Sequence, residues 1–311
     1  MSKTVKVFAC ASVGNMSVGF DVLGCALNEP GDIVEMTFTE GSEVRIVEIT
    51  GDDGKLPKEL MKNTAGIAVA KMLKHLNIEP GIDIKLHKQM PIGSGLGSSA
   101  ASAAAAVYAL NKLLSEPLTP IELVKFAMEG EKFASGAAHA DNVAPAILGG
   151  IILIRKYEPL DVISLPVPQN LHITVVHPDL VISTKEARSI LPDSFERIDY
   201  IKQSAALASF VQALHTNDFN LLSESVVDHL AEPYRKSLIN GFDAAKQAAL
   251  NAGALSFGIS GSGPSVFSFS SSLETAQQVG QAISDSFAHL NINSEIYAGK
   301  INQNGPKLIV E

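Results

Sequence analysis

The sequence predicts an α+β protein with two domains, and three observations carry this prediction. Residues 82–87 alternate apolar and polar side chains, as a half-buried strand does. Residues 98–114 contain neither Gly nor Pro and are mostly Ala, Val, Leu and Ser, which favours a buried helix. Prolines 159, 166 and 168 cluster near mid-chain, with strand-like and helix-like segments on both sides. We therefore expect one domain over residues 1–165 and a second over residues 166–311.

Composition limits the classes of function. The chain has 311 residues, of which 46% are hydrophobic, so it can bury a large core. Its formal net charge of −9 argues against nucleic acid or an anionic membrane as the main partner. Cys10 and Cys25 lack metal-binding spacing, and the N-terminus lacks a signal-peptide pattern. We expect a cytoplasmic protein that acts on small molecules without nucleic acid or membrane, and a homodimer is one option left open.

Periodicity predicts the elements of the first domain. Residues 4–12 resemble a strand, and residues 31–50 hold two alternating segments. A helix is expected over 64–76, with Asn63 favoured as its N-cap. Thr119 and Glu122 form a capping-box pattern before a helix that runs to about residue 134, and residues 151–155 resemble a buried strand.

The second domain is expected to mix strands and helices in one layer. The expected strands are 171–177, 254–260, 264–270 and 293–300, and the expected helices are 198–215, 217–229, 240–252 and 274–289.

A glycine loop separates the strand 82–87 from the helix 98–114. Gly93, Gly95 and Gly97 allow the backbone to turn with positive φ and leave room for a ligand. The free N–H groups and positive dipole of the following helix suit a phosphate. The pattern fits neither a Walker A loop nor the dinucleotide fingerprint. A tight turn without a ligand is the alternative, although the hydroxyls of Ser98 and Ser99 could cap the helix or face a phosphate and its Mg²⁺.

This loop resembles the phosphate-binding motif of the GHMP kinases, P-x-x-x-G-L-G-S-S-A. The resemblance implies that ATP binds along this stretch, which comprises Pro91, Ile92, Gly93, Ser94, Gly95, Leu96, Gly97, Ser98, Ser99, Ala100 and Ala101. In homoserine kinases an Asn near position 63 lies beside the adenine site, so Asn63 is also a candidate for cofactor binding.

Residues 14–24 resemble the first GHMP motif in its homoserine kinase form. Asn15 and Asp21 match the polar pair that lies in the amino-acid pocket of that family, where a carboxylate suits an ammonium group. Judged on local sequence alone, both could instead be ordinary turn residues. Cys10 and Gly14 depart from the usual Pro and Ala.

Residues 130–146 resemble a further signature, G-E-x-x-x-S-G-x-x-H-x-D-N-V-A-P-A. The resemblance gives Glu131 a role in Mg²⁺ binding together with Ser99, which we favour over Ser98. It places His139 and Asp141 at the substrate. Asn142 stands where mevalonate kinase-like relatives have an Asp as general base. The catalytic candidates are Asp141, Asn142, Glu131 and Asn15, and catalysis without a base is allowed because the transition state of phosphoryl transfer is loose.

Two arginines match substrate-side signatures of homoserine kinases. Arg188 belongs to a T-x-x-A-R pattern that begins at Thr184, and Arg235 belongs to E-P-x-R. There they bind the substrate carboxylate, for which the planar guanidinium is suited, although a surface Arg is usually just solvated. Residues 257–265 resemble the third GHMP motif, which closes over the phosphate and substrate and includes Gly261. The simpler interpretation is a hairpin turn.

The resemblance covers almost the whole chain and implies a specific fold and reaction. The implied fold is a ribosomal protein S5 domain 2-like N-terminal domain with a ferredoxin-like C-terminal domain. The implied reaction is ATP-dependent phosphorylation of the L-homoserine hydroxyl in threonine biosynthesis, with Mg²⁺ as cofactor. The alternatives are a mevalonate- or sugar-type GHMP kinase and an ATP-binding sensor without turnover.

Overall fold

The computed structural model describes residues 3–135 and 139–310, and its strands form two sheets. The first sheet contains β1 (Thr4–Gly14), β2 (Leu23–Thr39), β3 (Val44–Thr50), β4 (Gly81–His87), β5 (Ile151–Tyr157), β6 (Leu160–Leu165) and β11 (Lys307–Leu308). The second contains β7 (His172–Pro178), β8 (Gly258–Ile259), β9 (Val266–Ser270) and β10 (Ser294–Lys300). The predicted α+β architecture is confirmed.

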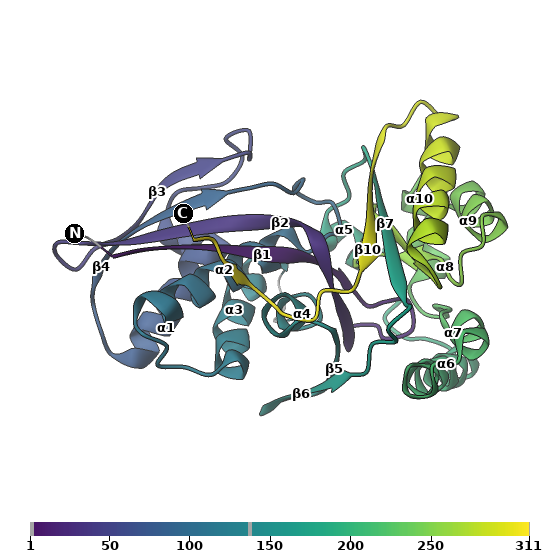
Figure 1. Cartoon of the computed structure of the whole chain (residues 1–311), viewed down its shortest axis with the longest axis horizontal. Coiled ribbons are helices and arrows are strands. Elements are labelled where there is room, and N and C mark those ends of the chain that lie inside the picture. Colours follow the sequence, from purple (N-terminus) through teal and green to yellow (C-terminus); the bar gives the residue numbers. More distant parts are fainter. Residues whose placement is uncertain (1–2, 136–138, 311) are drawn as a thin grey trace.

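Helices accompany both sheets, with α1 and α3 along the first and α9 and α10 beside the second (Figure 1). The helices are α1 (Thr64–Leu76), α2 (Ser98–Leu113), α3 (Pro120–Ser135), α4 (Val143–Leu148), α5 (Thr184–Ser189), α6 (Arg197–Thr216), α7 (Phe219–Ser225), α8 (Glu232–Arg235), α9 (Phe242–Asn251) and α10 (Leu273–Ala288), with short 3₁₀ turns at Leu60–Lys62 and Lys236–Leu238. Within the described ranges, we find no helix that combines the length and the apolar character needed to cross a bilayer.

The first sheet is mostly antiparallel. Its order is β11-β1-β2-β4-β3, and β5 adds to β2 further along that strand. Val34 of β2 pairs with Leu86 of β4, and β3 runs parallel to β4. Ile82, Ile84 and Leu86 are buried while the residues between them are only partly buried, which confirms the strand predicted from their alternation.

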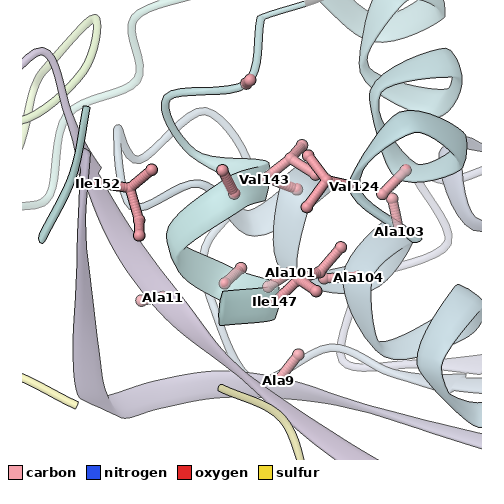
Figure 2. Close-up of a cluster of buried hydrophobic side chains, with 14 of the residues drawn as sticks. Ala9, Ala11, Ala101, Ala103, Ala104, Val124, Val143, Ile147 and Ile152 are labelled. Carbon is pink, nitrogen blue, oxygen red and sulfur yellow. The ribbon is translucent and has the colours of Figure 1, made fainter. Parts of the chain in front are cut away.

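Helix α2 fills the centre of this domain. Many of its side chains are small, because seven of its 16 residues are alanines, and Ala100 to Ala106 include no residue that is more than slightly exposed. Figure 2 shows Ala101, Ala103 and Ala104 gathered with alanines of β1 and with Val124 of α3. Small side chains let the helix approach its neighbours closely. The close packing fixes the position of the N-terminus of α2, where the glycine loop ends.

The second sheet has the order β10-β7-β9-β8. The strands predicted at 171–177, 264–270 and 293–300 are confirmed, but the strand expected over 254–260 shrinks to Gly258–Ile259. Residues 252–253 still belong to the turn after α9, and the Phe269 N–H of β9 donates to the hydroxyl of Ser256 instead of to a backbone carbonyl. The helix expected over 217–229 ends at Ser225. The chain then turns, and the carboxylate of Asp228 accepts hydrogen bonds from the N–H groups of Leu230 and Ala231.

The chain returns to the first sheet at its C-terminal end. β11 pairs with β1 through Val7 and Leu308, and Figure 1 shows this last segment running back along β1. We propose to keep the division into domains at residues 165 and 166, while the last strand completes the sheet of the first domain.

Replacing Ala104 with Leu is expected to lower the free energy of unfolding by about 1–3 kcal/mol, because added methylenes cannot be accommodated in a filled core. Ala104 has 0% exposure and lies in the cluster of Figure 2. Urea denaturation measures the change. The matched control is Ala205→Leu at an exposed position of α6, which should change stability by less than about 0.5 kcal/mol. Equal effects at the two positions would contradict the packing argument.

Candidate active site

A cavity of about 360 Å³ lies between the two halves of the chain, and elements of both domains line it. The predicted site residues that line it are Asn15, Asp21, Asn63, Ile92, Gly93, Ser94, Gly95, Gly97, Ser98, Ser99, Glu131, His139, Asp141, Asn142, Thr184, Arg188, Arg235 and Gly261. The structure thus brings together residues that are up to 246 positions apart in the sequence.

The glycine loop has the conformation expected of it. Gly93, Gly95 and Gly97 have φ of +71°, +76° and +68°. A Cβ at Gly95 would lie 2.6 Å from the carbonyl oxygen of Ser260 and 2.7 Å from that of Gly263. The space left by this glycine is therefore taken by the loop between β8 and β9. This corrects the expectation that the missing side chain of Gly95 makes room for a ligand.

Serine hydroxyls join the same two loops. Ser265 donates to the Ser94 carbonyl from its backbone N–H at 3.2 Å and from its hydroxyl at 2.6 Å. Ser260 Oγ donates to the Gly95 carbonyl at 2.7 Å. The hairpin predicted for residues 257–265 is present, and it holds the glycine loop in place across the domain boundary.

The first turn of α2 brings two serines to the cavity. Ser99 hydrogen bonds to the buried carboxyl group of Glu131. The Ser98 carbonyl accepts from Lys88 Nζ at 3.0 Å, and its buried hydroxyl has no hydrogen-bond partner among the described residues. Ser99, which we favoured over Ser98 as the partner of Glu131, is thus the serine that contacts it. Burial raises the pKa of Glu131, and the Ser99 hydrogen bond and the Lys88 charge oppose that shift.

Lys88 is a buried cation beneath this helix terminus, and the sequence interpretation missed it. Its ammonium group pairs with Asp32 and donates to Ser102 Oγ at 2.7 Å. All three of its N–H donors can therefore be used. The feature of the sequence that could have identified Lys88 is its position between a strand predicted to be half-buried and the glycine loop.

The substrate-side residues form one charged cluster. Arg188 Nη2 lies 3.0 Å from Asp21 Oδ1, and Nη1 lies 3.2 Å from Oδ2. Arg188 Nη2 also lies 3.1 Å from His139 Nε2. A guanidinium can only donate, so Nε2 accepts and Nδ1 carries the proton that faces Asp21 Oδ1 at 3.5 Å. Burial lowers the pKa of His139, against the opposing effect of Asp21, which fits a neutral ring.

Arg235 is held differently, since it is buried with 4% exposure. Its Nε donates to the Ala187 carbonyl at 2.9 Å and its Nη1 to the Gly261 carbonyl at 3.1 Å. The guanidinium carbons of Arg188 and Arg235 lie 5.6 Å and 5.3 Å from the centre of the Phe20 ring. Burial and the nearby Arg188 charge lower the pKa of Arg235. An anion in the cavity would relieve this concentration of positive charge.

Asn15 positions other groups through both ends of its amide. Nδ2 donates to the Gly261 carbonyl at 3.0 Å, and Oδ1 accepts from the Asp21 N–H at 2.9 Å. Thr184 Oγ1 lies 3.5 Å from Ser262 Oγ. The Gly261 carbonyl accepts from both Asn15 and Arg235, so this third-motif residue is a junction of the two domains.

Asp141 and Asn142 belong to the signature over residues 130–146, of which Gly136 lies outside the described residues. Asp141 is buried, and its Oδ1 has no hydrogen-bond partner within the described residues. Burial, reinforced by the charges of Asp21 and Glu131, raises the pKa of Asp141 to about 7. Asn142 Oδ1 accepts from Ser12 Oγ at 2.9 Å.

Asn63 caps α1, as predicted, by accepting from the Ala65 N–H at 3.1 Å. Its Nδ2 donates to the Pro57 carbonyl at 3.0 Å. Four residues of the predicted cofactor motif do not line the cavity, namely Pro91, Leu96, Ala100 and Ala101. Leu96 and both alanines have 0% exposure, so their side chains belong to the core.

Several residues at the site were not predicted. The additional lining residues are Leu56, Pro57, Lys62, Thr64, Leu86, Lys88, Ser102, Phe133 and Ser262. Tyr157 supports the cluster from behind, because its hydroxyl donates to the Asp21 carbonyl at 2.7 Å and lies 3.4 Å from the Ala140 N–H. No local motif marks Tyr157, because its partners come from distant segments.

Family models match both halves of the chain. The model of the GHMP kinases N terminal domain matches residues 62–150, and that of the GHMP kinases C terminal domain matches residues 210–289. The homoserine kinase of Chlorobium phaeobacteroides strain BS1 is 46% identical over 99% of this chain and 100% of its own. That of Xylella fastidiosa strain M12 is 37% identical over 98% of this chain and 94% of its own.

Solved structures agree. The crystal structure of homoserine kinase from Cytophaga hutchinsonii has a TM-score of 0.97 and 51% identity, covering 99% of this chain and 98% of that one. Mevalonate kinase from L. major in complex with R-mevalonate has a TM-score of 0.72 at 16% identity, covering 98% and 97%. The latter likeness concerns the fold.

Gly95→Ala is expected to destabilise the protein more than Gly93→Ala. Both residues have positive φ, so both variants bear a left-handed penalty of about 1–2 kcal/mol. At Gly95 the new Cβ also collides with two backbone oxygens, whereas at Gly93 it meets the Val181 side chain at 3.3 Å. Denaturation and nucleotide affinity should both change more for Gly95→Ala. Equal losses would show that backbone contact between the loops is unimportant.

Asp141→Asn is expected to change how stability depends on pH. The pKa of Asp141 is about 7 in the folded protein and 3.8 ordinarily, so the native state binds the proton more tightly than the unfolded state. The contribution of this group therefore falls as pH rises from about 4 to about 7 and levels off above that. The free energy of unfolding of the variant, relative to that of wild type, should therefore increase as pH rises from about 5 to about 8. Urea denaturation across this range tests it, and a pH-independent difference would contradict the raised pKa.

Proposed function

The chain belongs to the GHMP kinase family, in its homoserine kinase branch, and on this premise we propose that it transfers the γ-phosphoryl group of ATP to the hydroxyl of L-homoserine. The observation that carries the proposal is that one cavity combines a glycine loop at a helix N-terminus with an acid and two arginines. The first part suits a nucleotide phosphate. The second suits an amino-acid zwitterion.

The phosphate end of the cavity relies on backbone groups. Gly97, in the left-handed conformation, precedes α2 and has no side chain that could cap the helix. The first N–H groups of the helix are therefore available to an anion, and the helix dipole favours negative charge there. Buried Lys88, paired with Asp32, donates to the Ser98 carbonyl and so holds the same turn from behind.

Ser99 and Glu131 fit a Mg²⁺ ion that is held mostly by phosphates. Among the described residues, no group of three or more His, Cys, Asp or Glu side chains could hold a metal alone. Mg²⁺ in kinase sites typically uses one or two carboxylates with the substrate phosphates, and Glu131 beside a hydroxyl meets this need. The bound ion would neutralise charge on the transferred phosphoryl group.

The amino-acid end would match each substrate charge with an opposite one. Asp21 offers a carboxylate to the ammonium group, and Arg188 and Arg235 offer guanidinium groups to the carboxylate. In the free protein Asp21 and Arg188 bind each other. The substrate therefore inserts between them and replaces one ion pair with two.

Asp141 is the group suited to accept the hydroxyl proton. With a pKa of about 7 it is partly ionised at neutral pH, which is where a general base works best. Asn142 cannot take a proton, and its carbonyl oxygen is already engaged by Ser12. Asn142 would orient the substrate, while the loose transition state keeps the demand on the base small.

The proposal places the reaction in the cytoplasm, in threonine biosynthesis. Its test is ADP release with ATP and Mg²⁺ against L-homoserine, mevalonate and galactose in parallel. Turnover should require L-homoserine. Turnover only with mevalonate or galactose would assign another specificity, and ATP binding without turnover on any of them would indicate a sensor.

Arg188→Ala is expected to weaken L-homoserine binding by about 10- to 150-fold, the equivalent of one lost hydrogen bond to a charged group. ATP binding and stability should change little, because Arg188 is partly exposed and bonds only to the substrate-side cluster. Arg235→Ala should lower stability as well, because it frees two carbonyls from a buried donor.

Arg188→Lys is the charge-preserving control and should rescue poorly, since an ammonium group cannot supply the planar fork. Steady-state kinetics with each substrate varied, together with urea denaturation, separate these effects. An Arg188→Ala variant whose KM rises equally for ATP and homoserine would contradict a specific role at the amino acid.

A further inference from the structure

The loop that presents Asp21 is held in an unfavourable conformation. Asn15, Met16 and Ser17 have φ of +65°, +47° and +60°, and Asp21 has +59°. L-residues rarely adopt this left-handed region, and consecutive examples are rarer still. Such a conformation persists only where surrounding contacts over-determine it.

Contacts within the loop explain only part of its conformation. The Gly19 N–H donates to the Asn15 carbonyl at 2.9 Å, and the Asp21 N–H donates to Asn15 Oδ1 at 2.9 Å. Neither bond restrains the carbonyls of Ser17 and Val18, at the centre of the loop. Those two groups are buried with the loop and require donors from elsewhere.

Gln203 of α6 supplies these donors from the other domain. Its Nε2 donates to the Ser17 carbonyl at 3.1 Å and to the Val18 carbonyl at 2.8 Å. Its Oε1 accepts from the His229 N–H at 2.8 Å. The side chain has 6% exposure, and it is not among the residues that line the cavity. Both ends of a buried amide are therefore engaged, and its two donors both serve the strained loop.

We propose that Gln203 is a positioning residue that holds the loop of residues 15–21, four of which are left-handed, and so sets Asp21 to receive the ammonium group of the substrate. The proposal rests on the function proposed above. Glutamine suits the role because it combines two N–H donors with one acceptor. Glutamate, of the same shape, would keep the bond to His229 but turn a carboxylate oxygen toward two carbonyls.

The test compares Gln203→Glu with Gln212→Glu, a matched change at an exposed position of the same helix. In Gln203→Glu we expect the KM for L-homoserine to rise about 10-fold or more, because two buried hydrogen bonds are lost. The KM for ATP should stay within about twofold, since ATP is proposed to bind at the glycine loop and the first turn of α2 and not at residues 15–21. Gln212→Glu should change neither. Equal increases for both substrates, or none, would overturn the proposal.

A second variant tests the conformational cause directly. Adding Ser17→Gly to Gln203→Glu places at position 17 the residue that tolerates positive φ, and it removes a hydroxyl that has no hydrogen-bond partner among the described residues. The KM for L-homoserine should be at least about threefold lower in the double variant than in Gln203→Glu, because a glycine at position 17 keeps a positive φ with less restraint. A general packing role for Gln203 predicts no such rescue, and absence of rescue would refute the conformational role.

Two measurements do not depend on turnover. In the wild-type protein, NMR should show slowed exchange of the Gln203 side-chain amide protons relative to those of Gln212. Fast exchange would overturn the proposal even if every Gln203 variant failed to fold. In folded Gln203→Glu, the Gly19 and Asp21 amides should exchange faster than in wild type. If wild type does not turn over homoserine, the proposed function fails, while these exchange rates still decide whether Gln203 holds the loop.

Discussion

The site depends on a backbone-to-backbone contact between two glycine loops that belong to different sheets. The glycine loop before α2 and the loop between β8 and β9 approach so closely that a Cβ at Gly95 would overlap two carbonyl oxygens. Ser260 and Ser265 convert this proximity into hydrogen bonds to the Gly95 and Ser94 carbonyls. Because one loop leads into α2 and the other joins two strands of the second sheet, the contact fixes the N-terminus of α2 relative to the second domain. Glycine at this position thus serves assembly first, and any ligand benefits from it only indirectly.

The charged groups buried at this cavity differ in how fully hydrogen bonds and counter-charges offset their desolvation. Lys88 has Asp32, Ser102 and the Ser98 carbonyl around its ammonium group, so its desolvation is offset by hydrogen bonds. Asp141 lacks such compensation at Oδ1, and its pKa rises to about 7 in consequence. A well-compensated ion stays charged and structural, whereas a poorly compensated carboxyl group can exchange protons near neutral pH. The same cavity therefore contains both a charge that is fully compensated and a carboxyl group that can titrate.

The sequence could predict the long elements and the membership of the site, but not the partner of each residue. Periodicity located β4 and α1, and the Ala-rich composition without Gly or Pro located α2. Periodicity missed α5 and α8, which have six and four residues, too few to establish a helical period. Motif matching predicted that Leu96 belongs to the ATP-binding stretch, although its side chain packs into the core. Gln203 and Tyr157 carry no local signature, since their hydrogen bonds to the loop of residues 15–21 join segments more than 130 residues apart. Long-range contacts of this kind are determined by the fold as a whole.

The pairing of Asp21 with Arg188 has a consequence for specificity. Their side chains are 26% and 38% exposed, so the ion pair is partly solvated and contributes little to stability. Opening it is correspondingly inexpensive when a ligand supplies replacements for both charges. On the function proposed above, a zwitterionic amino acid would do so, with its ammonium group at Asp21 and its carboxylate at Arg188. A neutral alcohol of similar size would have to separate the two charges and leave each without a counter-charge, so the desolvation penalty would not be compensated. The free-state ion pair would thus discriminate against ligands that lack either charge, before any contact with the reacting hydroxyl is made.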